Sequence, residues 1–213
     1  MPLKTAAPAL ATLILLSSCG GPREDATPAT PRGPVQAPAS FQVRFETSKG
    51  DFTVEVTRDW APRGADRFYE LIQARLYDNC RFFRVVPRFV VQFGINGDPS
   101  VSRLWTQMRI PDDPVLQSNR KGTLSYAKSG PATRTTQVFI NLADNARLDS
   151  MGFAPFGKVA SGMEVIEGLY KLYGDAPPAG VGPLQDRIQL EGNAYLERYF
   201  PRLDFVKTAR IVQ

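Results

Sequence analysis

The order of apolar and polar residues from position 41 onward predicts many short strands and few helices. Alternation with a period of two predicts strands at 41–47, 51–56, 81–86, 89–93, 122–127, 136–142, 156–159 and 203–211. Apolar residues at helical spacing predict helices at 62–76, 163–173 and 186–199. Residues 95–120 follow neither period and contain Gly97 and three prolines, so we expect a long loop there.

These elements do not alternate as strand, helix, strand, which argues against a parallel sheet. About eight short strands with two or three helices favour a mainly β fold. The expected architecture is a closed eight-stranded antiparallel β-barrel capped by the helices. The folded domain is expected to span 41–213, and its extended C-terminal segment 175–213 has no role that the sequence indicates.

The first 19 residues have the pattern of a signal peptide. Lys4 precedes an apolar run at 6–16 that is too short for a permanent membrane helix. The run ends in Leu-Ser-Ser-Cys, which resembles a bacterial lipobox and predicts lipidation of Cys19. The alternative is an ordinary secretory signal with a chance cysteine. We therefore expect a lipid-anchored protein of the bacterial cell envelope, bound to a membrane through Cys19.

Residues 20–40 are rich in Pro, Ala and Gly and contain almost no large apolar side chains. Such a segment cannot bury enough apolar surface to offset its ordering entropy. It is predicted to be a disordered tether between the membrane and the domain.

Composition narrows the possible chemistry. The 213 residues carry a net charge of +5 without a run of Lys or Arg, so we expect no nucleic-acid partner. The absence of histidine excludes Ser-His-Asp and Cys-His mechanisms and histidine-containing zinc sites. With Cys19 lipidated, Cys80 has no partner and is expected to be a small buried hydrophobic residue. We expect no metal, no cofactor and a monomeric chain.

Residues 81–94 form an unusual apolar stretch because they include three arginines and a glutamine. A guanidinium is rarely buried without a partner, since removing its hydration is costly. Arg81 and Arg88 are expected to be solvated. Arg84 either lies on an exposed strand face or is held in a lined pocket for a purpose.

Three ordered blocks resemble the cyclophilin-type peptidyl-prolyl isomerases. Residues 82–94 read FFRVVPRFVVQFG, which is similar to the family pattern FHRIIPxFMxQGG. Residues 122–140 read GTLSYAKSGPATRTTQVFI, which is similar to the pattern GxLSMANxGPxTxxSQFFI. Leu148-Asp149 and the FGKV of 156–159 complete the match, which covers about 41–173. The resemblance implies the family's eight-stranded barrel with two capping helices.

The resemblance also implies an active site. Arg84 corresponds to the catalytic arginine, and Gln92 would orient it. The residues implied to bind substrate are Phe89, Val90, Ala127, Lys128, Gln137, Phe139 and Leu148. Phe153 is expected to occupy the space of a family histidine that this sequence lacks. Further departures from the family pattern are Phe83, Val90, Lys128, Arg147 and the segment 151–155.

Isomerisation of an Xaa-Pro bond requires no nucleophile, metal or titrating base, so a chain without histidine can catalyse it. The expected function is a peptidyl-prolyl cis-trans isomerase that acts on proline-containing segments of envelope proteins during folding. The alternative hypothesis is a catalytically weak chaperone or peptide-binding module on the same scaffold.

Overall fold

The computed structural model describes Met1 and residues 35–212. The signal segment, Cys19 and tether residues 20–34 lie outside these residues. The strands are β1 Ser40–Thr47, β2 Asp51–Thr57, β3 Arg84–Val86, β4 Val90–Phe93, β5 Thr123–Tyr126, β6 Val138–Asn141, β7 Pro155–Ser161 and β8 Val206–Ile211. The helices are η1 Arg58–Trp60, α1 Pro62–Gln73, α2 Pro99–Thr106, α3 Arg147–Ser150, α4 Met163–Glu167 and α5 Gln185–Tyr199.

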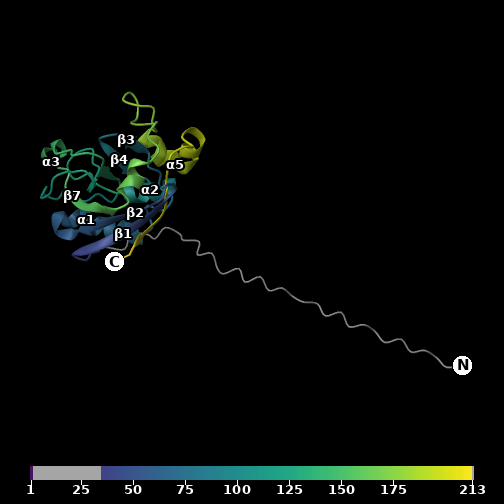
Figure 1. Cartoon of the computed structure of the whole chain (residues 1–213), viewed down its shortest axis with the longest axis horizontal. Helices are drawn as coiled ribbons and strands as arrows, with labels where there is room; N and C mark the ends of the chain where they lie inside the picture. Colours follow the sequence, from purple (N-terminus) through teal and green to yellow (C-terminus); the bar gives the residue numbers. More distant parts are fainter. Residues whose placement is uncertain (2–34, 213) are drawn as a thin grey trace.

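Within the described residues, one eight-stranded sheet has the order β3-β4-β6-β5-β7-β2-β1-β8, and all its pairings are antiparallel. The sheet curls around the core (Figure 1). The prediction of a closed barrel is wrong, because no ladder joins the edge strands β3 and β8. The segments just before these strands are joined by an isolated bridge between Arg81 and Phe205 and by backbone hydrogen bonds, such as that from the amide of Phe82 to the carbonyl of Asp204 at 3.0 Å. With three residues, β3 is too short to continue the pairing.

The main core lies between the sheet and α1. Alternation along β1 buries every second side chain, and Phe45 stacks on Phe52 with ring centroids 4.7 Å apart. From α1, Phe68 enters the same core. Cys80 is also fully buried there, as predicted, and burial raises the pKa of its thiol.

The three predicted helices exist, but their limits differ from the prediction. Helix α1 ends at Gln73 rather than 76, because Arg75 adopts a φ of 53°, outside the right-handed helical region. Helix α4 ends at Glu167 rather than 173, and the amide of Tyr170 donates to Asp204 instead of to a helical carbonyl. Helix α5 is kinked at Gly192, which has a φ of 62°.

The expected long loop at 95–120 contains α2. Asp98 caps this helix by accepting a hydrogen bond from the amide of Ser100 at 2.8 Å, and Pro99 occupies its first turn. Helix α2 packs against α5. The amide of Asn193, just after the kink of α5, donates to the carbonyl of Gly97 at 2.9 Å. The C-terminal helix is therefore joined to the loop that precedes α2.

The C-terminal segment has an apolar cluster of its own. The cluster contains Phe83, Ile95, Ile188, Tyr195, Leu196 and Leu203. It holds α5 against residues that flank β3 and β4. In Figure 1 the chain between α4 and α5 rises beside the β3 and α5 labels. The segment that the sequence left without a role thus lies next to the hairpin that carries Arg84.

The sequence analysis placed the start of the domain at residue 41, but folded structure begins earlier. Ala37 is buried, and its amide donates to Asp66 of α1 at 2.8 Å. The amide of Arg58 donates to the carbonyl of Ala39. Among the described residues, no helix has the length and apolar character needed to span a membrane.

The two arginines that were expected to be solvated differ in their exposure to solvent. Arg88 is exposed at the turn between β3 and β4. Arg81 is not solvated: its side chain pairs with Glu197 at 3.0 Å, and its guanidinium lies 4.4 Å from the Phe205 ring centroid. Arg81 therefore helps to hold α5 and the segment before β8 together.

Candidate functional site

The antiparallel pairing of strands β3, β4 and β6 brings Arg84, Gln92 and Phe139 together. Arg84 on β3 is opposite Gln92 on β4, and Gln92 is opposite Phe139 on β6. Nη1 of Arg84 donates to Oε1 of Gln92 at 3.2 Å. Nε2 of Gln92 donates in turn to Oε1 of Gln137 at 2.8 Å. Gln92 therefore fixes one edge of the guanidinium and aligns a second amide beside it.

A carboxylate that the sequence did not indicate completes this arrangement. Asp175, between α4 and α5, accepts from Nε of Arg84 at 2.8 Å and from Nη2 at 2.6 Å. Both side chains of this bidentate ion pair are partly buried. Hydrogen bonds from Arg84 hold the pKa of Asp175 below its ordinary value of 3.8, although partial burial opposes the shift. Asp175 is therefore ionised at neutral pH.

Apolar side chains beside Arg84 form a cluster separate from the main core. Val90, Phe139 and Leu148 are its buried members, and Phe89, Ala127 and Phe153 pack around them. The rings of Phe139 and Phe153 meet edge to face at 5.7 Å. The guanidinium of Arg84 lies 5.5 Å from the Phe89 ring centroid. This cluster forms the apolar floor of the site, and the Arg84 cation lies at its edge.

All ten site residues predicted from the sequence line a single cavity of about 660 Å³. They are Arg84, Phe89, Val90, Gln92, Ala127, Lys128, Gln137, Phe139, Leu148 and Phe153. Sequence reasoning missed other lining residues, among them Thr106, Arg109, Asp175, Gln185, Asp186 and Gln189. The last four come from the C-terminal segment, so this segment forms a wall of the cavity.

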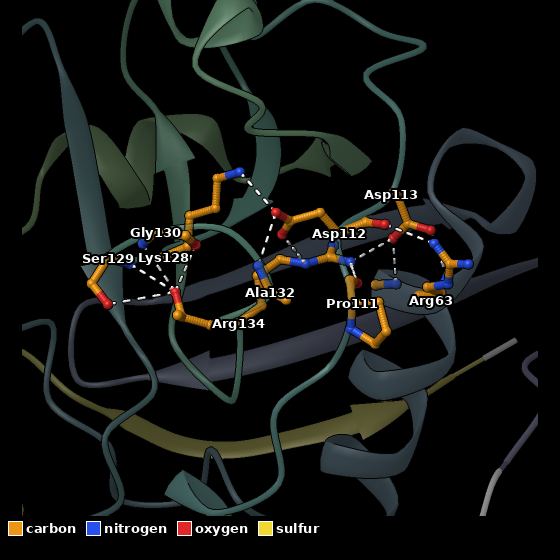
Figure 2. Close-up of polar contacts among 11 residues, drawn as sticks. Arg63, Pro111, Asp112, Asp113, Lys128, Ser129, Gly130, Ala132 and Arg134 are labelled. Atoms are coloured by element: carbon orange, nitrogen blue, oxygen red, sulfur yellow. Dashed lines mark hydrogen bonds and ion pairs between the residues drawn. The ribbon is translucent and has the colours of Figure 1, made fainter.

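A buried polar network holds the rim that carries Lys128 (Figure 2). The amides of Arg63 and Gly64, at the start of α1, donate to Asp113 at 3.0 and 2.9 Å. Nη2 of Arg134 also donates to Asp113 at 3.0 Å, and only 2% of the Asp113 side chain and 4% of the Arg134 side chain are exposed. These contacts anchor segments 111–113 and 128–134 to α1.

Lys128 is attached to this network. Its ammonium donates to Asp112 at 3.2 Å and lies 5.5 Å from the Phe153 ring centroid. Figure 2 shows Lys128 extending to Asp112 while Arg134 approaches the same residue. The Lys128 charge is therefore balanced at the rim. Beside the apolar floor, the guanidinium of Arg147 lies 4.8 Å and that of Arg84 lies 5.5 Å from the Phe89 ring centroid.

A second network sets the position of Leu148. Asp149 accepts from the amide and the side-chain nitrogen of Asn119 at 2.9 and 2.8 Å. Nδ2 of Asn119 also donates to the carbonyl of Phe153 at 2.8 Å. Asn119 is fully buried, and its Oδ1 accepts from the hydroxyl of Ser125 on β5 at 2.9 Å, so Asn119 ties α3 and the following turn to the sheet. The apolar floor consequently rests on fixed backbone.

The site has the means for noncovalent catalysis. It contains a permanent cation, aligned amides and an apolar surface. Among the described residues, no group of three or more Cys, Asp or Glu side chains is arranged to hold a metal ion. The arrangement can bind an apolar ring and stabilise negative or lone-pair character beside it.

Comparison with known proteins agrees with this geometry. Residues 42–189 match the family model described as cyclophilin type peptidyl-prolyl cis-trans isomerase. Peptidyl-prolyl cis-trans isomerase-like 1 of Aspergillus oryzae is 38% identical over 158 residues, covering 70% of this chain and 96% of that protein. Peptidyl-prolyl cis-trans isomerase CYP18-2 of Arabidopsis thaliana is 38% identical over 134 residues, covering 60% and 79% respectively.

A solved structure also shares the fold. The cyclophilin-type isomerase of Cryptosporidium parvum superimposes with a TM-score of 0.60 at 22% identity, covering 82% of this chain and 98% of that one. The motif match, the relatives and the fold agree, and the chain belongs to the family of cyclophilin-type peptidyl-prolyl cis-trans isomerases.

Proposed function

We propose that the cavity accelerates rotation about Xaa-Pro bonds, with Arg84 as the catalytic donor. The observation that carries this proposal is the Arg84 guanidinium, held by Gln92 beside the cluster of Val90, Phe139 and Leu148. The apolar cluster receives the proline ring, and Arg84 donates a hydrogen bond where the amide loses its resonance. A structure of the C. parvum isomerase has also been solved in the presence of the dipeptide Ala-Pro, which contains an Xaa-Pro bond.

The proposed mechanism uses position and charge alone. The barrier to rotation is about 18–20 kcal/mol because the amide is conjugated. In the twisted transition state the prolyl nitrogen becomes basic, and a preorganised cation stabilises it more than it stabilises the planar amide. Acceleration to millisecond turnover requires about 7 kcal/mol, since each 1.4 kcal/mol contributes a factor of ten. An arginine supplies its charge at every physiological pH.

The remaining residues of the site have matching roles. Gln92 holds Arg84, and Gln137 faces the substrate backbone. Ala127 and Lys128 lie beside the residue that precedes the proline. Phe89, Leu148 and Phe153 complete the apolar surface. No residue in this scheme changes its covalent bonds or its protonation state.

The decisive experiment measures isomerisation of an Ala-Pro-Phe peptide by exchange NMR or by a protease-coupled assay. Arg84→Ala should lower kcat/KM by about a hundredfold or more, the cost of losing a preorganised donor. Arg103→Ala, which removes an exposed arginine from α2, serves as the matched control and should be inert. Saturable peptide binding without accelerated exchange in the unaltered protein would instead establish the peptide-binding module.

We further propose that the protein acts in the bacterial cell envelope, anchored through lipidated Cys19, on proline-containing segments of envelope proteins. The lipobox-like sequence before Cys19 supports this proposal. Mass spectrometry of the mature protein should find Cys19 as the acylated N-terminal residue. Cys19→Ser should move the protein from the membrane fraction to the soluble fraction. An unprocessed N-terminus, or a cleavage elsewhere, would contradict lipidation.

A further inference from the structure

Asp175 lies in a turn that is built around it. The backbone carbonyl of Asp175 accepts from the amide of Gly182 at 2.8 Å, and the amide of Ala176 donates to its Oδ1 at 2.8 Å. A Cβ atom at Gly180 would lie 2.6 Å from the backbone nitrogen of Asp175 and would also overlap its carbonyl. Only glycine at position 180 allows this close approach. The turn therefore fixes the backbone and one carboxylate oxygen of Asp175.

The contact with Asp175 uses one side of the Arg84 guanidinium. Nε and Nη2 donate to Asp175, whereas Nη1 donates to Gln92. A guanidinium has five N–H donors, so one on Nη1 and one on Nη2 stay free for a ligand. Arg84 stays over the Phe89 ring while it is paired. Asp175 thus holds the guanidinium inside the cavity and leaves donors available.

An unpaired arginine on β3 would sample many rotamers, because its side chain is long and partly exposed. Two parallel N–H···O bonds to a fixed carboxylate remove this freedom, since both groups are planar. The carboxylate also weakens the field of the cation at the cavity. The proposal requires positioning to outweigh this weakening of the field. Arg84 keeps donors that Asp175 does not use, and both residues line the cavity.

We propose that Asp175 is a positioning residue of the isomerase site, which fixes the Arg84 guanidinium in the orientation that meets the prolyl nitrogen. This role presupposes Arg84 as the donor of the proposed function. It gives the loop between α4 and α5 a task in the reaction. The contrary reading is a lid, in which Asp175 sequesters Arg84 and must leave before the substrate binds.

The test compares kcat and KM for Asp175→Ala and Asp175→Asn in the full-length protein, by the exchange and protease-coupled assays. Asp175→Ala should lower kcat about tenfold and change KM less than twofold, because ordering of the donor is lost and the apolar floor is intact. Asp175→Asn retains one acceptor and the shape of the turn, so it should recover part of the rate. Asp59→Ala removes an exposed carboxylate outside the cavity and is the matched control.

A double variant tests whether the effect of Asp175 on kcat depends on Arg84. Arg84→Lys has no planar fork, so removing Asp175 from that variant should change kcat less than twofold. A tenfold loss in the Arg84→Lys background would overturn the proposal, as would an unchanged or increased kcat/KM in Asp175→Ala. An increase would identify the lid. Failure of the proposed function is a separate result, namely an Arg84→Ala variant that keeps full activity.

Discussion

The carboxylate of Asp175 holds the guanidinium of Arg84 through two hydrogen bonds of 2.8 and 2.6 Å, although 91 residues separate them in the chain. Arg84 lies in the strand hairpin that carries the family motif, and Asp175 lies in a segment that the motif does not include. The cavity is therefore shared between the sheet and the C-terminal segment. Four lining residues of that segment extend the site beyond the predicted ten.

Replacing Gln92 by leucine tests the amide that connects Arg84 to Gln137. The Gln92 residue is 6% exposed, and the substitution removes both of its hydrogen bonds while keeping an apolar volume. We expect kcat/KM to fall about tenfold, the usual worth of a buried hydrogen bond to a charged group. Gln107→Leu, just after α2 on the surface, is the control. A Gln92→Leu variant with activity within twofold of the unaltered protein would exclude this bracing role.

Truncating Phe139 tests the apolar floor. Phe139→Ala should raise KM and lower kcat/KM by about tenfold or more, because the proline ring loses an apolar partner. It should also lower the free energy of unfolding by about 3 kcal/mol, the lower end for a buried Phe, since Phe139 lies outside the main core cluster.

Two further variants separate the loss of binding from the loss of fold. Phe139→Leu fills more of the space and should recover most of the stability while binding the peptide less tightly than the unaltered protein. Leu116→Ala removes a side chain that is 60% exposed and should change neither quantity. The role of the floor is disproved if Phe139→Ala, folded by circular dichroism, has an unchanged KM and kcat.

The Arg84–Asp175 pair should make stability depend on pH in a defined window. The folded-state pKa of Asp175 lies below the ordinary value of 3.8, so its ionised form favours folding above about pH 4. This contribution is lost as the pH falls through the folded pKa. Among charged residues that line the cavity, Arg84 faces Asp175 directly; the others are Arg109, Lys128 and Asp186.

Urea denaturation of the unaltered protein and of Asp175→Asn gives the measurement. The difference in the free energy of unfolding should be constant, at about 1 kcal/mol, from pH 7 to 5, and should shrink toward zero below pH 3. The comparison cancels the contributions of other carboxylates. A difference that grows as the pH falls would have the wrong sign and would contradict the assignment.

Cys80 should be inert toward alkylation in the native protein. It is fully buried, and burial raises the pKa of its thiol, so little thiolate is present and no reagent has access. In a Cys19→Ser variant, iodoacetamide at pH 8 should label Cys80 only as fast as the domain opens. Labelling should become complete in 6 M guanidinium chloride. Fast labelling of the folded variant, checked by mass spectrometry, would show that the thiol is accessible.

The sequence predicted the strands well because one face of each packs on a core, which produces alternation. β1 shows this in its burial, with Phe41, Val43 and Phe45 inside. The ten site residues predicted from the sequence line one cavity, and nine of them lie within the three blocks that resemble the family pattern, whereas Phe153 lies between the two parts of the third block. The limits of helices were less predictable, since they depend on contacts made elsewhere, such as that of Tyr170 with Asp204.

Helix α2 and Asp175 were missed for different reasons. Asp98 and Pro99 form a recognisable helix start, but the prolines that follow favoured a loop. Asp175 has no comparable local signal, because an ion pair between residues far apart leaves no periodic pattern in the sequence. The open edge between β3 and β8 was also beyond prediction, since a count of strands does not show which pairs form.

The place of β8 has a consequence for how the protein is made. β8 pairs with β1 at the edge of the sheet, although β1 is the first of the described strands to be synthesised and β8 is the last. One side of β1 therefore has unpaired backbone groups until β8 has been synthesised, and such an edge favours aggregation. The sheet is therefore complete only after the ribosome has released β8, the strand that covers this edge of β1.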